Sequence, residues 1–217
     1  MKIFKVILMI AVFGVFSSQA SANLLSDPGF ENGGTAIAIK DGPWTWSGGS
    51  NGDAFYDATV SMNGAKAAKV VAWGGNLTDY AYFNEDFTGI DFSSPYLLNG
   101  NFLWNSAETL KNGSTVKLQV KWFNSLGSVI RTDESAIFDN SYASDTWHPL
   151  DITTAAAPAG TVKVSAVVAL NANGAYTPNS AVWVDDMSFQ AVPEPASMLL
   201  LGSGLVGLLG FGRRKRS

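Results

Sequence analysis

Few side chains in this sequence could act as a nucleophile, a general base or a soft metal ligand. The 217 residues include one histidine, His148, and no cysteine. A histidine-rich zinc site, a cysteine nucleophile and disulfides are therefore excluded, and a Ser-His-Asp triad would have a single candidate base. His148 directly precedes Pro149, and we interpret it as a strand-edge residue.

Two pairs of adjacent acids, Glu85-Asp86 and Asp133-Glu134, have the side-chain type that hydrolyses glycosidic bonds. Neighbours in a strand point to opposite faces, so neither pair converges on one bond by itself. Acids distant in the sequence remain an alternative. The sequence has no G-x-S-x-G, H-E-x-x-H or P-loop motif. We therefore predict a protein that is not an enzyme, with a secreted glycoside hydrolase as the alternative.

Tryptophan is the other residue type with a chemical use, because a flat aromatic face stacks on a sugar ring. Of the seven tryptophans, Trp122 fits an inward position of a strand. The ligand-binding candidates are Trp44, Trp46 and Trp73, and the less constrained aromatics also include Trp104, Tyr80, Tyr82 and Tyr96. Trp44 and Trp46 share a face if their segment is extended. A place in the core is the alternative for each of them.

Short strands must position these side chains. Residues 115–123 alternate between apolar and polar, with Val116, Leu118, Val120 and Trp122 on one face. In 161–170 the same pattern predicts inward Val162, Val164, Ala166, Val168 and Leu170. Further strands are expected at 66–72, 80–87, 96–104, 128–132, 147–152 and 181–190, separated by turn clusters such as 47–52. No helix of three or more turns is expected in 23–191. The pattern predicts an antiparallel β-sandwich.

The first 22 residues have the order of a secretory signal peptide. A charged start with Lys2 and Lys5 precedes the apolar run 6–16, and Ala20 and Ala22 supply the A-x-A pattern that signal peptidase reads. We expect cleavage after Ala22, so that the mature chain begins at Asn23.

The C-terminal end reads as a processing segment. Pro193, Glu194 and Pro195 precede the uncharged residues 196–212, which would span about 26 Å as a helix. The basic cluster Arg213, Arg214, Lys215 and Arg216 should remain cytoplasmic, which places residues 23–195 outside the cytoplasm. An ordinary tail anchor is the alternative.

This combination of Pro-Glu-Pro, a glycine-rich apolar span and a basic end resembles the PEP-CTERM sorting signal over residues 192–217. The resemblance implies recognition near Pro193-Glu194-Pro195 by an exosortase, a membrane-embedded enzyme. It also implies a Gram-negative host that makes exopolysaccharide. The precursor would then reside in the inner membrane through 196–212 until it is processed, and the product would reach the cell surface or the medium.

The exported part is acidic. Residues 23–195 contain all 18 acidic and eight of the 14 basic side chains, which gives them a formal charge of −10. Such a surface disfavours nucleic acid, because lysine and arginine are needed to neutralise phosphates. It is compatible with binding divalent cations.

A second resemblance covers most of 23–190. The opening 23–32, the closing 181–189 and the segments 120–127, 147–150 and 157–161 look like galactose-binding-like jelly rolls of the carbohydrate-binding-module type. The resemblance implies first and last strands that lie side by side, in many members with a structural calcium ion between them. Asp27, Glu31, Asp185 and Asp186 are the acids available there, and Glu31 and Asp186 are the favoured ligands. Solvated strand-end acids are the alternative.

Three functions remain open. The first is an exported, exosortase-sorted surface or matrix protein whose β-sandwich 23–191 binds polysaccharide without catalysis. The second is a purely structural biofilm or adhesion protein without a small ligand. The third is the secreted glycoside hydrolase.

Overall fold

The computed structural model of the chain describes residues 21–34, 38–48, 52–72, 80–111, 113–172 and 180–192. Within them the chain forms ten strands and one short 3-10 helix, η1 (Ile39–Asp41). The strands are β1 (Thr45–Gly48), β2 (Gly52–Asp57), β3 (Ala67–Ala72), β4 (Tyr80–Phe87), β5 (Tyr96–Leu103), β6 (Thr115–Phe123), β7 (Val129–Glu134), β8 (His148–Thr153), β9 (Lys163–Asn171) and β10 (Ser180–Ala191). The predicted all-β class is confirmed.

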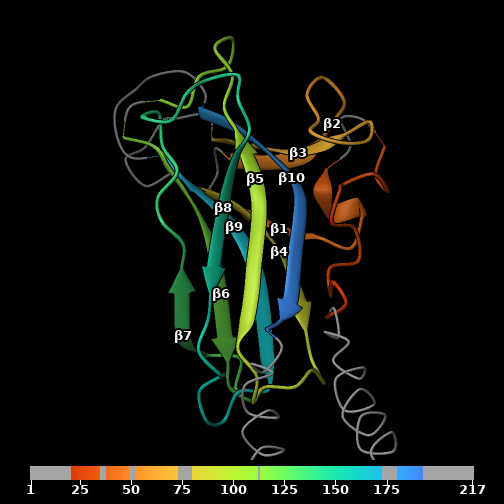
Figure 1. Cartoon of the computed structure of the whole chain (residues 1–217), viewed down its shortest axis with the longest axis vertical. Coiled ribbons are helices and arrows are strands. Elements are labelled where there is room, and N and C mark those ends of the chain that lie inside the picture. Colours follow the sequence, from red (N-terminus) through yellow and green to blue (C-terminus); the bar gives the residue numbers. More distant parts are fainter. Residues whose placement is uncertain are drawn as a thin grey trace, which may run out of the picture. The chain divides into compact units, whose positions relative to one another are not determined.

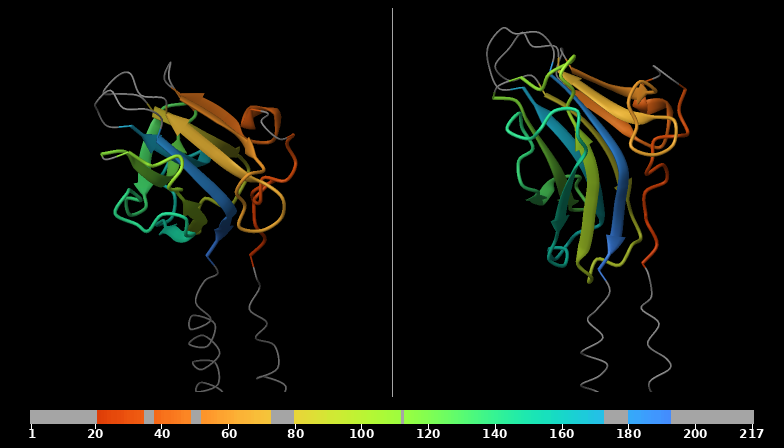
Figure 2. Two further views of the ribbon diagram at one scale, coloured as in Figure 1. Left: turned by 90° about the horizontal axis from the view of Figure 1, so that it is seen from above. Right: turned by 45° about the horizontal axis from the view of Figure 1, so that its top comes forward.

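The strands make two five-stranded sheets, which face each other as the two layers of a sandwich (Figures 1 and 2). Sheet I has the order β1-β4-β9-β6-β7, and sheet II has the order β2-β3-β10-β5-β8. All neighbouring strands are antiparallel. The predicted antiparallel sandwich is therefore correct, and each sheet has one strand buried at its centre, β9 or β10.

All eight strands expected from the sequence are present within two residues of their expected bounds. In β6, every second side chain from Val116 to Trp122 is buried, as the alternation predicts. In β9 the inward residues are buried too, but Val162 is 45% exposed because the strand begins one residue after it. The expectation for Val162 was wrong.

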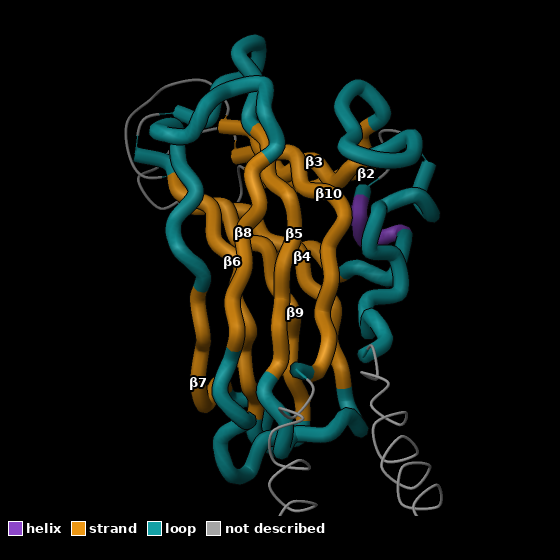
Figure 3. Tube along the Cα trace, viewed as in Figure 1, coloured by secondary structure: helices purple, strands orange, loops and turns teal. Residues whose placement is uncertain are grey.

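Strands β1 and β2 were not expected, because they flank a segment rich in Gly, Ser and Asn that indicates a turn. Both strands are short. In β2 only Ala54 and Tyr56 are buried apolar residues, and the strand also contains Asp53 and Asp57, so its alternation is too weak to predict a strand. Figure 3 shows β2 close to η1, which is coloured purple.

The first and last strands do not pair. Strand β1 is an edge of sheet I, whereas β10 is the centre of sheet II. The residues that lie along β10 are instead the irregular segment before β1, where the Leu24 amide donates to the Phe189 carbonyl at 2.8 Å and the Met187 amide donates to the Pro28 carbonyl at 2.9 Å. The opening segment therefore lies beside the last strand, as the resemblance implies, but the first strand, β1, does not.

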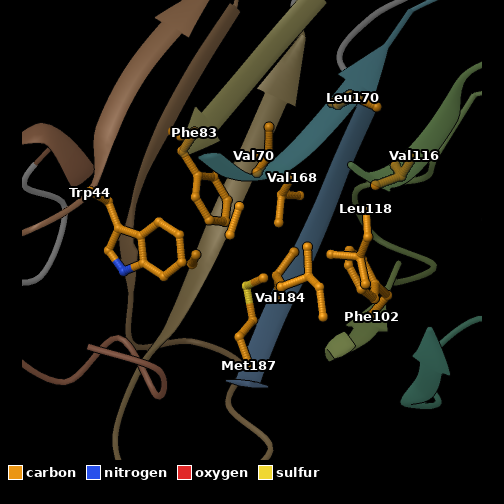
Figure 4. Packing of buried hydrophobic residues seen from close by; sticks show 14 of the residues in the cluster. Trp44, Val70, Phe83, Phe102, Val116, Leu118, Val168, Leu170, Val184 and Met187 are labelled. Atoms are coloured by element: carbon orange, nitrogen blue, oxygen red, sulfur yellow. The ribbon is translucent and has the colours of Figure 1, made fainter. Parts of the chain in front are cut away.

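The core lies between the sheets (Figure 4). At one end Trp44 packs on Phe30 and edge-on to Phe83, with ring centroids 5.3 and 5.1 Å apart, and its indole N–H donates to the Asp27 carbonyl at 3.1 Å. Burial of such aromatic side chains is the main stabilising contribution in a domain without disulfides. A second, smaller cluster around Trp183 lies on the outer side of sheet II, and Trp147 packs against it.

Residues 23–191 form one compact unit. In the described part of the chain no helix is long and apolar enough to cross a membrane. The expected signal peptide with Ala20, the sorting motif at 193–195, the span 196–212 and the basic cluster 213–216 lie outside the described residues. Those expectations about the two ends stay predictions as far as the structure is concerned.

Candidate functional site

The outer face of sheet I has small side chains along its central strand. Ser165, Val167 and Ala169 of β9 point away from the core, because they alternate with the inward Val164, Ala166 and Val168. They are nevertheless only 2%, 1% and 8% exposed. Side chains of the neighbouring strands β4 and β6 must therefore lie across them.

Strand β4 contributes two aromatic rings to this face. Tyr82 lies opposite Ala169, and Tyr80 lies two residues before it on the same face. The two rings are nearly parallel, with centroids 5.9 Å apart and planes 11° apart, and Tyr80 is 41% exposed. The ammonium of Lys121 on β6 lies 5.0 Å from the centroid of Tyr82. The face therefore carries a stacked pair of aromatic rings with a cation over one of them, and the more exposed ring of the pair belongs to Tyr80.

Strand β6 contributes the polar side of the face. Lys117 lies opposite Ala169, and Gln119 lies opposite Val167. Both reach the next strand, where Glu134 accepts from the Lys117 ammonium at 2.6 Å and from the Gln119 amide at 2.7 Å. The hydrogen bond from Lys117 holds the pKa of Glu134 below its usual value despite partial burial. These groups offer donors and acceptors of the kind that bind hydroxyl groups.

An ionic cluster occupies the other end of the face. Asp86 on β4 accepts from the Lys163 ammonium at 2.7 Å, from the Asn84 amide at 2.8 Å and from the Ser165 hydroxyl. Partial burial opposes ionisation of Asp86, but these hydrogen bonds outweigh it and lower the pKa of the carboxyl group. Asp86 is therefore a paired carboxylate at neutral pH.

Asp86 and Glu134, the described carboxyl groups of this face with a shifted pKa, are both held in the ionised form and so are not suited to donate a proton. A glycosidase needs a general acid whose pKa is raised. Burial raises the pKa of Glu85 and of Asp185, but Glu85 is 7% exposed and faces inward, where it accepts from the amide and hydroxyl of Ser26, and Asp185 is fully buried on sheet II. His148 is bound to the Ala143 carbonyl at 3.0 Å on edge strand β8 of the same sheet. The described acids of the face are suited to binding.

The tryptophans selected from the sequence do not gather on this face. Trp44 is 1% exposed in the core, so it has no ring surface to offer a ligand, and the interpretation of Trp44 as a stacking residue is wrong in this structure. Trp46 lies opposite the core residue Phe83 and packs half-buried against the core. Trp73 lies outside the described residues. The alternation of β4 was the signal that could have selected Tyr80 and Tyr82 instead.

The acids expected to bind calcium have other partners in the structure. One oxygen of Glu31 accepts two backbone amides, from Ala65 and Lys66, and Asp186 accepts from the Asn63 side chain. Asp185 is fully buried beside a β-bulge at which Asp186 has a φ of 48°. Among the described residues no three acidic or histidine side chains are placed to hold a metal ion. Calcium stays a prediction that this donor set does not favour.

Comparison with known proteins addresses the C-terminal end and the fold. Residues 191–216 match the PEP-CTERM protein-sorting motif. No curated protein is significantly similar in sequence to the chain.

Several solved structures share the fold at low sequence identity. The family 22 carbohydrate-binding module of Clostridium thermocellum Xyn10B is 14% identical with a TM-score of 0.53, over 77% of this chain and 94% of that one. The CBM22-1 xylan-binding domain of Paenibacillus barcinonensis Xyn10C is 14% identical with a TM-score of 0.52, over 82% of this chain and 100% of that one.

The fold is not confined to such modules. The enzymatically active domain of tailspike protein 4 from bacteriophage CBA120 is 9% identical with a TM-score of 0.51, over 78% of this chain and 21% of that one. This chain thus spans about a fifth of the tailspike domain and nearly the whole of the two binding modules. It carries a PEP-CTERM protein-sorting motif, and its β-sandwich is similar to carbohydrate-binding-module domains.

Proposed function

We propose that this protein is exported, processed by an exosortase near Pro193-Glu194-Pro195, and binds a polysaccharide at the cell surface or in the extracellular matrix without catalysis. The proposal rests on the outer face of sheet I. The stacked rings of Tyr80 and Tyr82 lie on one side of the small residues of β9. Lys117, Gln119 and Lys121 of β6 lie on the other side, and the Lys121 ammonium reaches over the Tyr82 ring. Aromatic rings stack on the apolar faces of sugars, and the polar side chains bind hydroxyl groups.

The sorting motif supports export and membrane processing. The likeness to carbohydrate-binding modules supports the ligand class through the fold alone, since function depends on the site. The absence of a raised-pKa carboxyl group among the described residues of the face supports binding over hydrolysis. The biofilm or matrix role is part of the proposal.

Affinity electrophoresis in gels cast with different polysaccharides tests the proposal. We expect at least one neutral or weakly charged polysaccharide to retard the protein. Retardation should change little with added salt, because stacking and hydrogen bonds between uncharged groups are not screened. If retardation occurs and disappears steeply with salt, adsorption is charge-driven and the face is not a sugar-binding site. If no polysaccharide retards the protein, a purely structural role replaces the proposal.

A further inference from the structure

A short loop before β3 binds two carboxylates through its backbone. In the segment Ser61–Lys66, here named the clamp loop, the amides of Met62 and Asn63 donate to Oδ2 of Asp185 at 2.8 and 3.2 Å. The amides of Ala65 and Lys66 donate to Oε1 of Glu31 at 2.8 and 3.0 Å. Four nearly consecutive backbone N–H groups therefore face two acidic side chains, in the manner of an anion-binding turn.

Gly64 makes this geometry possible. It has a φ of 69°, in the left-handed region that glycine adopts without strain. A Cβ at this position would lie 2.1 Å from Oε1 of Glu31. A residue with a side chain is therefore excluded at position 64. Only glycine leaves room for the Glu31 carboxylate between the two pairs of donor amides.

The last residue of the clamp loop also supplies a cation. The Lys66 ammonium donates to the main-chain carbonyls of Glu31 and Gly33, at 2.7 Å each. Main-chain carbonyls beside carboxylates are the oxygen ligands that a calcium ion takes. Here an ammonium group of the chain itself is bound to them.

The opening segment is fixed to the body of the sandwich at this place. Asp27 accepts from the amides of Glu31 and Asn32 at 2.9 and 3.3 Å, which closes the turn that carries Glu31. Asp185 belongs to β10 at the centre of sheet II and is fully buried. The clamp loop thus links the opening segment to β10 through groups that come entirely from the chain.

We infer that the clamp loop, with the Lys66 ammonium, is a built-in substitute for a metal ion at this junction, and that the fold does not depend on calcium. The backbone amides neutralise Glu31 and Asp185, and Lys66 binds the carbonyls that would otherwise ligate a cation. This inference concerns the junction of the opening segment with β10 of sheet II, not the outer face of sheet I, and does not rest on the sugar-binding proposal.

Thermal unfolding of the full chain in detergent, followed by near-ultraviolet circular dichroism, tests the inference. We expect the wild-type Tm to agree within about 1 °C in millimolar calcium and in chelator, because a ligand raises Tm only where the folded state binds it. Lys66→Met should lower Tm by about 4 °C or more, since two main-chain carbonyls, one of them part-buried, lose a charged donor. Lys40→Met is the matched control, because Lys40 is exposed on η1 and should leave Tm unchanged.

Lys66→Arg keeps the charge and should restore most of the loss, which separates the role of the cation from the packing of the side-chain stem. A calcium-dependent rise in the wild-type Tm of about 4 °C or more would overturn the inference in favour of a metal site. Equal melting of Lys66→Met and Lys40→Met would overturn it by removing the role of the ammonium. The wild-type comparison decides the matter even if Lys66→Met fails to fold.

Discussion

Tyr80 and Tyr82 stack on the outer face of sheet I, with ring centroids 5.9 Å apart and planes 11° apart. Alternate residues of a strand share a face and are about 6.6 Å apart along it, which brings the two rings into this stacked arrangement. The stacked pair lies beside small residues of β9, and the Lys121 ammonium lies over the Tyr82 ring, 5.0 Å from its centroid. Because these side chains are already held in place on a strand, little conformational entropy is lost when a ligand binds. A modest contact area can then be enough for binding.

Truncation of Trp44 should affect stability and not ligand binding. Trp44→Ala removes a buried ring that packs on Phe30 and Phe83, and we expect it to lower the free energy of unfolding by about 3–5 kcal/mol. Denaturant unfolding measures this loss. At temperatures where the variant remains folded, its affinity for polysaccharide should equal that of the wild type. Lost binding with unchanged stability would restore the interpretation of Trp44 as a stacking residue.

Stability should depend on pH with opposite sign at two adjacent acids. Burial raises the pKa of Glu85 above 4.5, so the folded state binds this proton more tightly than the unfolded chain, and its contribution to stability falls as the pH rises through that range. The pKa of Asp86 is lowered from 3.8, so its contribution is present above that value and is lost as the pH falls below it.

Denaturant unfolding between pH 3 and pH 7 tests the two signs. Glu85→Gln should gain stability relative to the wild type on going from about pH 4 to pH 7, because the penalty for burying a charge is removed. Asp86→Asn, the matched control on the solvent side of the same strand, should lose less stability than the wild type in acid. Parallel pH profiles for Glu85→Gln and the wild type would contradict the assignment of the penalty to Glu85.

Replacement of Pro193-Glu194-Pro195 by three alanines should block C-terminal processing. The uncut form should then accumulate in the inner membrane, because residues 191–216 match the sorting motif and the span 196–212 is uncharged. Intact-mass measurement of the exported protein and of the membrane fraction shows whether cleavage has occurred. A triple alanine in the span at Leu199-Leu200-Leu201 keeps the tripeptide and is the control. Normal processing of the Pro-Glu-Pro variant would contradict the role of the motif.

Local alternation was enough to predict most of the fold. The inner face of β6 and the buried Trp122 follow directly from the period of two. Pairing is not local, so the sequence could not show that β10 lies between β3 and β5 while β1 joins the other sheet. Strand β1 is four residues long and runs into glycine, which leaves no pattern to detect.

The candidate site was harder to predict, because aromatic type alone does not separate core from surface. Trp44 and Tyr82 looked equivalent in the sequence, yet Trp44 is buried beside Phe83 while Tyr82 occupies the outward position of an alternating strand. The bulge in β10 shows the same limit. One extra residue between Asp185 and Ser188 breaks the alternation of β10, so the directions of Asp185 and Asp186 could not be predicted from a period of two.

Tyr82→Ala tests the central claim, measured by affinity electrophoresis against the polysaccharide that best retards the wild type. We predict that retardation is lost or reduced about tenfold, because removal of one stacking ring costs roughly 1–1.5 kcal/mol. Asp151→Ala is the matched control, since Asp151 is exposed on β8 of the opposite sheet and should bind as the wild type does. Tm should be unchanged in Asp151→Ala and should fall by only a few degrees in Tyr82→Ala, which loses its stacking on Tyr80 but no core contact. Wild-type retardation of a folded Tyr82→Ala protein would contradict the assignment of the sugar-binding face to sheet I.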